Sequence, residues 1–558
     1  MRIPTPVWAM LAAVLGCSAA GAQDTGQALD PKDIYQPLAQ SWPTYSGDYS
    51  GRRYSQLSQI NRDTVKDLSL AWSMRLPMEH DPANTSIGGE VAEPVPFGGP
   101  GANGARIAGS VLEVKGILYV SAPDNAWAVD ARTGRTLWHY FWKSRGGTHI
   151  GNRGMAMYQN RVYFEVPDDY VICLDATTGK ELWHTQIADF NQQYFSTMAP
   201  IVVDGHLLIG TGNDMDAPGF LRSLDPVTGK EQWTLWTTPH NKGDPGSDTW
   251  PNEETARYGG GNVWVPGVFD PETRLYIFGT GNPTPATSAG SRPGDNLFTS
   301  SFIAVNVDTG KMAWYYQVTP HDTHDMDSAL TPVLMDGTFN GKPRKLMLNA
   351  NRNGYFFVLD RVTGEHLLTM PFTQAANWAS GLNAKGQPVG DPKKQATVGG
   401  TLVFPSNPGF ANWMPAAYSP KTGLYYFTTD ESYSEYYLTD TDPRAAQGFG
   451  GAKEDMLGSL GRSLLAVDYR TGKTSWRVDF PLSLAIAGGL PGMLVTAGDV
   501  LFGADAAGNL VARDATNGRP LWHTMLGKVS NAPETYELDG KQYLLIAVTD
   551  SLYAFRLN

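Results

Sequence analysis

The chain has 558 residues, of which 41% are hydrophobic and 18% are charged, and it contains 61 glycines and 38 prolines. Its net charge of −12 at pH 7 argues against a nucleic-acid partner, because phosphate binding needs a basic surface. Glycine and proline at this density predict many tight turns and therefore many short strands.

The first 22 residues predict a signal peptide. A mostly apolar stretch from Val7 to Cys17 is followed by the small-residue cleavage site Ala20-Gly21-Ala22. We expect the mature chain to be exported to the periplasm and to form one domain, residues 23–558. No other stretch reaches the ~18–20 continuous apolar residues of a membrane span. After cleavage Cys173 is the only cysteine, which excludes an intramolecular disulfide.

A turn motif recurs along the rest of the chain: an apolar strand, Asp, two residues, Thr-Gly and then Trp. The Asp side chain can bond the backbone of its own turn, and Gly supplies the positive φ. The copies are AVDARTGRTLW (128–138), CLDATTGKELW (173–183), SLDPVTGKEQW (223–233), AVNVDTGKMAW (304–314), VLDRVTGEHLL (358–368), AVDYRTGKTSW (466–476) and ARDATNGRPLW (512–522), with weaker copies at 269–275 and 418–424.

Copies about 40–50 residues apart match one four-stranded sheet each. We therefore predict an all-β fold, an eight-bladed β-propeller with Trp-containing blade repeats. An open array of hairpins is the alternative, and its long exposed edges make it unfavourable. The last strand pair and residues 48–72 are predicted to share a blade and close the ring. Residues 239–259, 284–295 and 372–411 are predicted to be loops over one face that select the substrate.

Residues 319–327, TPHDTHDMD, hold two His and three Asp, and the stretch 320–326 alone holds two of each. Such a cluster is costly to bury without a function. The residues by themselves allow a catalytic or metal site, a charged surface loop, or a zinc site of a hydrolase.

Together with GGGNVWVPG (259–267) and GTGNP (279–283), this segment resembles the quinoprotein alcohol dehydrogenases that use pyrroloquinoline quinone (PQQ). The resemblance extends from residue 42 to residue 545. It implies that the quinone stacks on Trp264 and that two arginines pair with its carboxylates. The implied cofactor-binding residues are Arg153, Thr197, Thr211, Asn262, Trp264 and Arg352.

The resemblance also implies one metal ion, held by Asp214, Asn282, Asp325 and Asp327. The family usually has Glu where Asp214 stands, so this ligand is one methylene shorter. Asp327 is an added carboxylate that resembles the lanthanide-dependent members, because hard, highly charged cations favour oxygen ligands. We lean to a lanthanide, with calcium as the alternative.

Asp325 matches the catalytic base of the family. The implied reaction oxidises a primary or secondary alcohol to an aldehyde or ketone by hydride transfer to the quinone. No C-x-x-C-H haem motif is present, so the electrons are expected to pass to a separate acceptor such as a periplasmic cytochrome c. The alternatives are a quinoprotein acting on sugars or polyols and a non-enzymatic propeller scaffold of the cell envelope.

Four positions depart from the family. Gly147 and Thr148 stand where many members carry an adjacent cysteine pair over the quinone, so we predict an atypical member without that disulfide. Ala108 takes the place of a Glu near the cofactor, and Leu490 falls near the place of a Trp.

Overall fold

The computed structural model describes residues 29–79, 106–144, 152–192, 194–212, 216–439, 450–480 and 490–558. The predicted signal peptide, the predicted ligand Asp214, and Gly147 and Thr148 lie outside these residues. Among the helices of the described residues, none has the length and apolar character that crossing a membrane requires.

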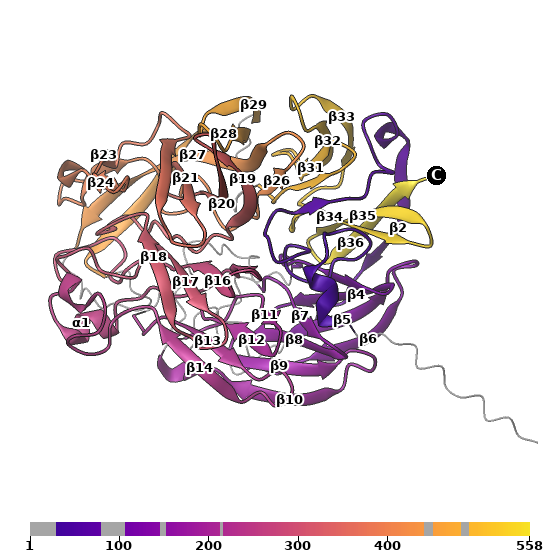
Figure 1. Ribbon diagram of the computed structural model, residues 1–558, viewed down its shortest axis with the longest axis horizontal. Helices are drawn as coiled ribbons and strands as arrows, with labels where there is room; N and C mark the ends of the chain where they lie inside the picture. The colour runs from indigo at the N-terminus through magenta and orange to yellow at the C-terminus, as the bar shows by residue number, and fades with distance from the viewer. Residues whose placement is uncertain are drawn as a thin grey trace, which may run out of the picture.

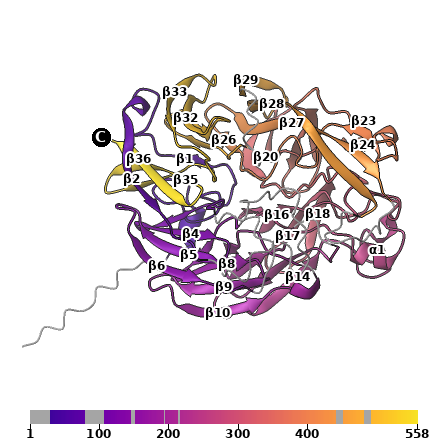
Figure 2. The same ribbon diagram turned by 180° about the vertical axis from the view of Figure 1, so that it is seen from behind.

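The described residues form eight sheets of four or five strands around a central axis (Figure 1), and the same order is visible from behind (Figure 2). The predicted all-β propeller is confirmed. The first five sheets in chain order are β3 (Leu112–Val114), β4 (Ile117–Ala122), β5 (Asn125–Asp130), β6 (Thr136–Phe141); β7 (Ala156–Tyr158), β8 (Arg161–Val166), β9 (Tyr170–Asp175), β10 (Glu181–Gln186); β11 (Ile201–Val203), β12 (His206–Ile209), β13 (Phe220–Leu224), β14 (Glu231–Trp236); β15 (Val268–Asp270), β16 (Leu275–Gly279), β17 (Ser301–Asn306), β18 (Met312–Gln317); and β19 (Val333–Phe339), β20 (Lys342–Ala350), β21 (Tyr355–Asp360), β22 (His366–Pro371).

The last three sheets contain additional or returning strands. They are β26 (Ala417–Ser419), β27 (Leu424–Leu438), β28 (Ala452–Asp468), β29 (Thr474–Phe480) with β25 (Thr401–Val403); β30 (Leu494–Thr496), β31 (Val500–Ala504), β32 (Asn509–Asp514), β33 (Pro520–Met525) with β1 (Tyr54–Ser55); and β34 (Glu534–Leu538), β35 (Lys541–Val548), β36 (Ser551–Leu557) with β2 (Leu68–Arg75). Outside them lie the pair β23 (Ala379–Leu382) and β24 (Pro388–Gly390), the helix α1 (Glu253–Arg257), and the 3₁₀ turns η1 (Pro31–Tyr35), η2 (Val65–Asp67), η3 (Phe190–Gln192), η4 (Ser247–Thr249) and η5 (Pro392–Lys394).

The ring is closed by strands from the two ends of the chain. Strand β2 pairs antiparallel with β36, from Leu68 opposite Leu557 to Arg75 opposite Ser551. In Figure 1 the indigo β2 lies beside the yellow β36. The prediction that the two terminal segments share a blade is confirmed.

The repeat motif joins each sheet to the next. The indole Nε1 of Trp138 donates to the carbonyl oxygen of Ala176 at 2.9 Å, and Gly179 of the following turn lies on the same indole. Gly179 has φ +69°, and a Cβ there would lie 2.6 Å from the Trp138 ring. Glycine is therefore required both by the turn and by the packing of the tryptophan. The two weaker copies of the motif lie elsewhere in the blade, in the turns β15–β16 and β26–β27 between the first and second strands.

Burial shows which strand of each sheet is central. The first strands β3, β11 and β15 are wholly buried, whereas the fourth strands β10 and β14 are half exposed. The first strands therefore line the axis. Since successive strands are antiparallel, the segment before a first strand and the loop between second and third strands lie on the same face. We call this the upper face.

All three predicted loops belong to the upper face by this rule. Residues 239–259 and 372–411 lead into the first strands β15 and β26, and residues 284–295 join β16 to β17. The first loop contains η4 and α1, and the third contains β23, β24, η5 and β25.

Candidate active site

The predicted site residues come from the two kinds of segment that form the upper face. Arg153, Thr197, Asn262, Trp264, Asp325 and Asp327 precede the first strands β7, β11, β15 and β19. Thr211, Asn282 and Arg352 follow the second strands β12, β16 and β20. Four consecutive blades thus direct these residues to one end of the axis.

Asp327 is the centre of the cluster and is fully buried. Its Oδ2 accepts a hydrogen bond from Trp264 Nε1 at 3.0 Å and lies 3.1 Å from Arg352 Nη2. Its Oδ1 accepts a hydrogen bond from the backbone N–H of Asn282. Burial raises the pKa of the Asp327 carboxyl, and the charge of Arg352 opposes that rise. Three protein donors therefore occupy most of the lone-pair sites of this carboxylate.

Asp325 lies beside Asp327 and faces the same guanidinium. Its Oδ2 is 3.6 Å from Arg352 Nη1, which also donates to the Asp325 carbonyl oxygen at 2.9 Å. Asp325 is 3% exposed and has φ +61°, in the left-handed region. Two buried carboxylates are thus held around one arginine, and the Trp264 indole connects Asp327 to the preceding blade.

Arg153 lies over aromatic rings. Its guanidinium carbon is 4.5 Å from the centroid of Trp264 and 4.9 Å from that of Trp413, an arrangement in which a cation is attracted to a ring face. Its Nη1 donates to the Thr197 carbonyl oxygen at 3.1 Å. Burial lowers the pKa of Arg153 to about 9. Arg352 also lies over Trp264, at 5.4 Å.

Two glycine-rich turns connect the remaining predicted residues. Asn262 Nδ2 donates to Thr211 Oγ1 at 3.2 Å, and the Asn262 carbonyl accepts from the Gly281 N–H at 2.8 Å. A Cβ at Gly281 would lie 3.1 Å from Asp327 Oδ1, which is closer than most side chains tolerate. The bare backbone at Gly281 therefore lets the Asp327 carboxylate approach the Asn282 turn.

The residues present suit a flat anionic cofactor. Two buried polar atoms at the site, Thr197 Oγ1 and Arg153 Nε, have no hydrogen-bond partner among the described residues. A buried polar group without a partner is unfavourable, so a ligand with acceptor oxygens would stabilise both. Trp264 offers a ring face, and Arg153 and Arg352 offer guanidinium groups for carboxylates.

The donor atoms of the predicted metal ligands are oxygens, which would suit a hard cation. Asn282 Nδ2 donates to the Pro283 carbonyl at 3.0 Å, so the amide oxygen is the end that can face a cation. Asp325 and Asp327 bring two carboxylates. No group of three or more His, Cys, Asp or Glu side chains that could hold a metal forms among the described residues, which do not include Asp214.

The two histidines of the 319–327 segment are engaged elsewhere. His321 Nδ1 is hydrogen-bonded to the Gly294 carbonyl at 2.7 Å, and His324 Nε2 to the Lys394 carbonyl at 2.7 Å. Burial lowers the pKa of His324 to about 4, so this ring is neutral near pH 7. The zinc-hydrolase alternative therefore gains no ligand from either imidazole ring through these nitrogens.

Sequence reasoning missed several residues of the site. Trp413 lies in the segment before β26, the same kind of position that Trp264 occupies before β15, and this equivalence could have identified it. Asn407 accepts from Arg352 Nη1 at 3.1 Å, and its N–H donates to Glu454 at 2.8 Å. Glu454 stands in no motif. It reaches Asn407 through the long pairing of β27 with β28 (Figure 2). Of the departures, Ala108 and Leu490 are buried apolar residues.

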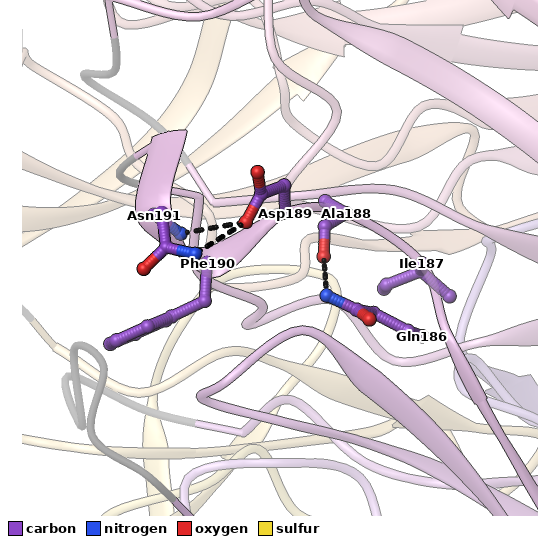
Figure 3. Close-up of a pocket in the computed structure, with 6 residues that line it drawn as sticks. All are labelled: Gln186, Ile187, Ala188, Asp189, Phe190 and Asn191. Carbon is purple, nitrogen blue, oxygen red and sulfur yellow. Dashed lines mark hydrogen bonds between the residues drawn. The ribbon is translucent and has the colours of Figure 1, made fainter.

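A separate pocket is lined by six consecutive residues that begin with the last residue of β10, Gln186 to Asn191 (Figure 3). Its polar groups bond within the segment: Gln186 Nε2 donates to the Ala188 carbonyl at 2.9 Å, and the backbone N–H of Asn191 donates to Asp189 at 3.0 Å. None of the predicted site residues lines it.

Comparison with known proteins identifies the family. Residues 42–388 match the family model described as the β-propeller domain of glucose, ethanol and alcohol dehydrogenases that use PQQ. The chain belongs to the PQQ-dependent alcohol dehydrogenase family. It is therefore an oxidoreductase, and the family assignment predicted from the motifs is confirmed. Residues 461–556 also match a model of the outer-membrane assembly factor BamB.

Relatives in this family resemble the chain over most of its length. A quinohemoprotein alcohol dehydrogenase of Comamonas testosteroni is 34% identical over 97% of this chain and 78% of the relative, and its crystal structure superposes with a TM-score of 0.83. The quinoprotein alcohol dehydrogenase PedH of Pseudomonas putida is 32% identical over 96% of this chain and 90% of the relative. A europium-containing methanol dehydrogenase structure is 27% identical, with a TM-score of 0.80 over 94% of this chain and 99% of that one.

Proposed function

We propose that this protein is a PQQ- and metal-dependent dehydrogenase that oxidises a primary or secondary alcohol to an aldehyde or ketone. The observation that carries the proposal is the grouping of Asp325, Asp327, Arg352 and Trp264 within direct contact at the upper end of the axis. The printed names of the family relatives, which are alcohol and methanol dehydrogenases, support the substrate class.

Asp325 is the proposed general base. Its carboxylate accepts the proton of the substrate hydroxyl, as carboxylates held in water-poor sites do. Arg352 Nη1 lies 3.6 Å from Asp325 Oδ2, and its positive charge compensates the negative charge of the Asp325 carboxylate. The bond from Arg352 to the Asp325 carbonyl fixes the backbone of the base, so that the carboxylate keeps one orientation between turnovers.

The proposed cofactor-binding residues are Arg153, Thr197, Thr211, Asn262, Trp264 and Arg352. When bound, the quinone supplies a two-electron acceptor for the hydride of the carbinol carbon, and the metal supplies a Lewis acid. The chain would contribute binding and orientation: the Trp264 ring would support the flat face of the quinone, and the two guanidinium groups would pair with its carboxylates.

Asp214, Asn282, Asp325 and Asp327 are the proposed metal ligands. Asp327 keeps part of its coordination capacity although it accepts from three protein donors, because a carboxylate has about four lone-pair sites. The second carboxylate and the europium-containing neighbour favour a lanthanide over calcium.

We propose that the mature enzyme works in the periplasm, which the predicted signal peptide supports, and that its electrons pass there to a separate acceptor, a cytochrome c. The acidic net charge of −12 would suit a basic acceptor protein.

The test is reconstitution of the purified protein with PQQ and either calcium or a light lanthanide. A dye-linked assay on a panel of alcohols, sugars and polyols then reports activity. We expect alcohol oxidation with at least one metal, and loss of it in Asp325→Asn. Asp336→Asn changes an exposed carboxylate in the same way and serves as the matched control. Absence of both quinone absorbance and activity with every metal would overturn the proposal.

A further inference from the structure

Asp322 holds the backbone on both sides of Asp325. Its Oδ1 accepts from the His324 N–H at 2.9 Å, and its Oδ2 accepts from the Met326 N–H at 2.7 Å. Asp322 is 2% exposed, so water does not compete for these bonds. One carboxylate therefore holds the backbone at both ends of the segment from His324 to Met326, which contains Asp325; we call this pair of bonds the bracket.

The backbone conformation of Asp325 is one that depends on such support. At φ +61° it is in the left-handed region, which is unfavourable for most residues other than glycine. A conformation of this kind persists when the surrounding contacts determine it. One bond acts on the peptide unit that follows Asp325, and the other acts on the peptide unit that precedes His324. Together they fix the short backbone segment that contains Asp325, and so the direction in which its side chain leaves the backbone.

Arg292 connects this bracket to the loop that follows Asn282. The guanidinium is fully buried, and its Nη2 donates to the Asp322 carbonyl at 2.6 Å. It also donates twice to the Pro285 carbonyl, at 3.0 and 2.8 Å, and to Asn296 Oδ1 at 2.8 Å. All these acceptors are uncharged groups, so the arginine acts as a connector with several donors rather than as half of an ion pair.

We propose that Asp322 is the positioning residue for Asp325, and that Arg292 fixes the base segment relative to the Asn282 turn. The inference rests on the proposed role of Asp325 as the base. Asp322 acts through the backbone and makes none of its hydrogen bonds to the reacting groups. Its effect is therefore on the geometry of proton removal rather than on cofactor affinity.

The first test compares Asp322→Asn with the parent, both loaded with PQQ and metal. The amide can accept only one of the two backbone N–H groups. The rate of quinone reduction by alcohol in a single turnover, measured per bound quinone, is expected to fall between about tenfold and a hundredfold. Quinone affinity and the alcohol concentration for half-maximal rate should stay within about twofold of the parent, because the residues that bind them are unchanged.

Asp225→Asn is the matched control. Asp225 also accepts two backbone N–H groups, from Val227 at 3.0 Å and Thr228 at 2.7 Å, but in a blade turn of the repeat. This variant should keep the parental rate per bound quinone. A purely structural role of Asp322 would lower the amount of loaded protein in the same way and leave the rate per quinone unchanged. That result would overturn the inference.

A second measurement does not depend on a variant folding. Hydrogen exchange over residues 321–327 of the cofactor-free parent should be slow at His324 and Met326, because both amides are bonded inside the protein. Exchange at the rate of an unstructured chain would overturn the bracket.

The role of Arg292 has its own test. Arg292→Lys, which cannot reach the three acceptors, should reduce the turnover rate as Asp322→Asn does. A parental rate would remove Arg292 from the proposal.

The outcomes separate this inference from the proposed function. An inactive Asp325→Asn with a fully active Asp322→Asn would overturn the positioning role alone. A fully active Asp325→Asn would overturn the proposed base, and the positioning role with it, whatever the exchange data show.

Discussion

Asp327→Ala should destabilise the protein even when no metal or quinone is present. The substitution removes the acceptor of the Trp264 indole and of the Asn282 N–H, and it removes the carboxylate that lies beside Arg352 Nη2. Removing one partner of a buried ion pair typically costs ~3–5 kcal/mol, because the remaining charge stays buried. Arg352 keeps Asp325 at 3.6 Å, which places the expected loss at the lower end of that range.

Urea denaturation of chelator-treated protein, followed by tryptophan fluorescence, measures this loss as a shift of the midpoint at constant slope. Asp336→Ala is the matched control, since Asp336 pairs with Arg361 at 2.7 Å but its side chain is 64% exposed. Exposed pairs contribute about 0–1 kcal/mol. If Asp327→Ala lost no more stability than Asp336→Ala, the carboxylate would not be the organising centre of the site.

Three further predictions concern the cofactor, the pH dependence and the blade contacts. Trp264→Ala should weaken PQQ binding at least about tenfold in an absorbance titration, because a base-sized aromatic contact contributes ~1–3 kcal/mol; equal affinity would exclude stacking. Burial raises the pKa of Glu534 from 4.5 to about 7, so the folded protein keeps a proton that the unfolded chain releases, and stability should fall as pH rises through this interval. Glu534→Gln should make the fall of the melting temperature between those pH values smaller, and an unchanged fall would contradict the assignment. Gly179→Ala should lower the melting temperature because its Cβ would meet Trp138 at 2.6 Å, whereas Gly205→Ala, with open space, should not.

The fold was predictable because the information that specifies each blade is local. Each copy of the repeat contains its own turn chemistry, and the Gly that lies on the tryptophan of the preceding blade is part of the same few residues, as Gly179 and Trp138 show. The closing pair β2–β36 could be predicted because the last strand pair has no repeat turn after it and residues 48–72 have no repeat turn before them.

Residues of the candidate site could be proposed from the sequence only where they form motifs. Trp264, Asn282 and Asp325 stand in short sequence patterns, and the structure brings them together. The sequence could not reveal that Asp327 accepts from Trp264 and Asn282, because that contact depends on how two blades are oriented. Arg292 could not be identified from the sequence for another reason. Most of its acceptors are backbone carbonyls, which every residue has, so no residue pattern indicates them.

The pairing of β2 with β36 also determines when folding can finish. Residues 68–75 have no partner in their sheet until residues 551–557 exist, so the ring cannot close before that segment has been synthesised. Contacts this far apart in sequence are slow to form because a long loop must close first. Until then the edges of β2 and of the last sheet remain open to other strands, and the growing chain is most vulnerable to aggregation.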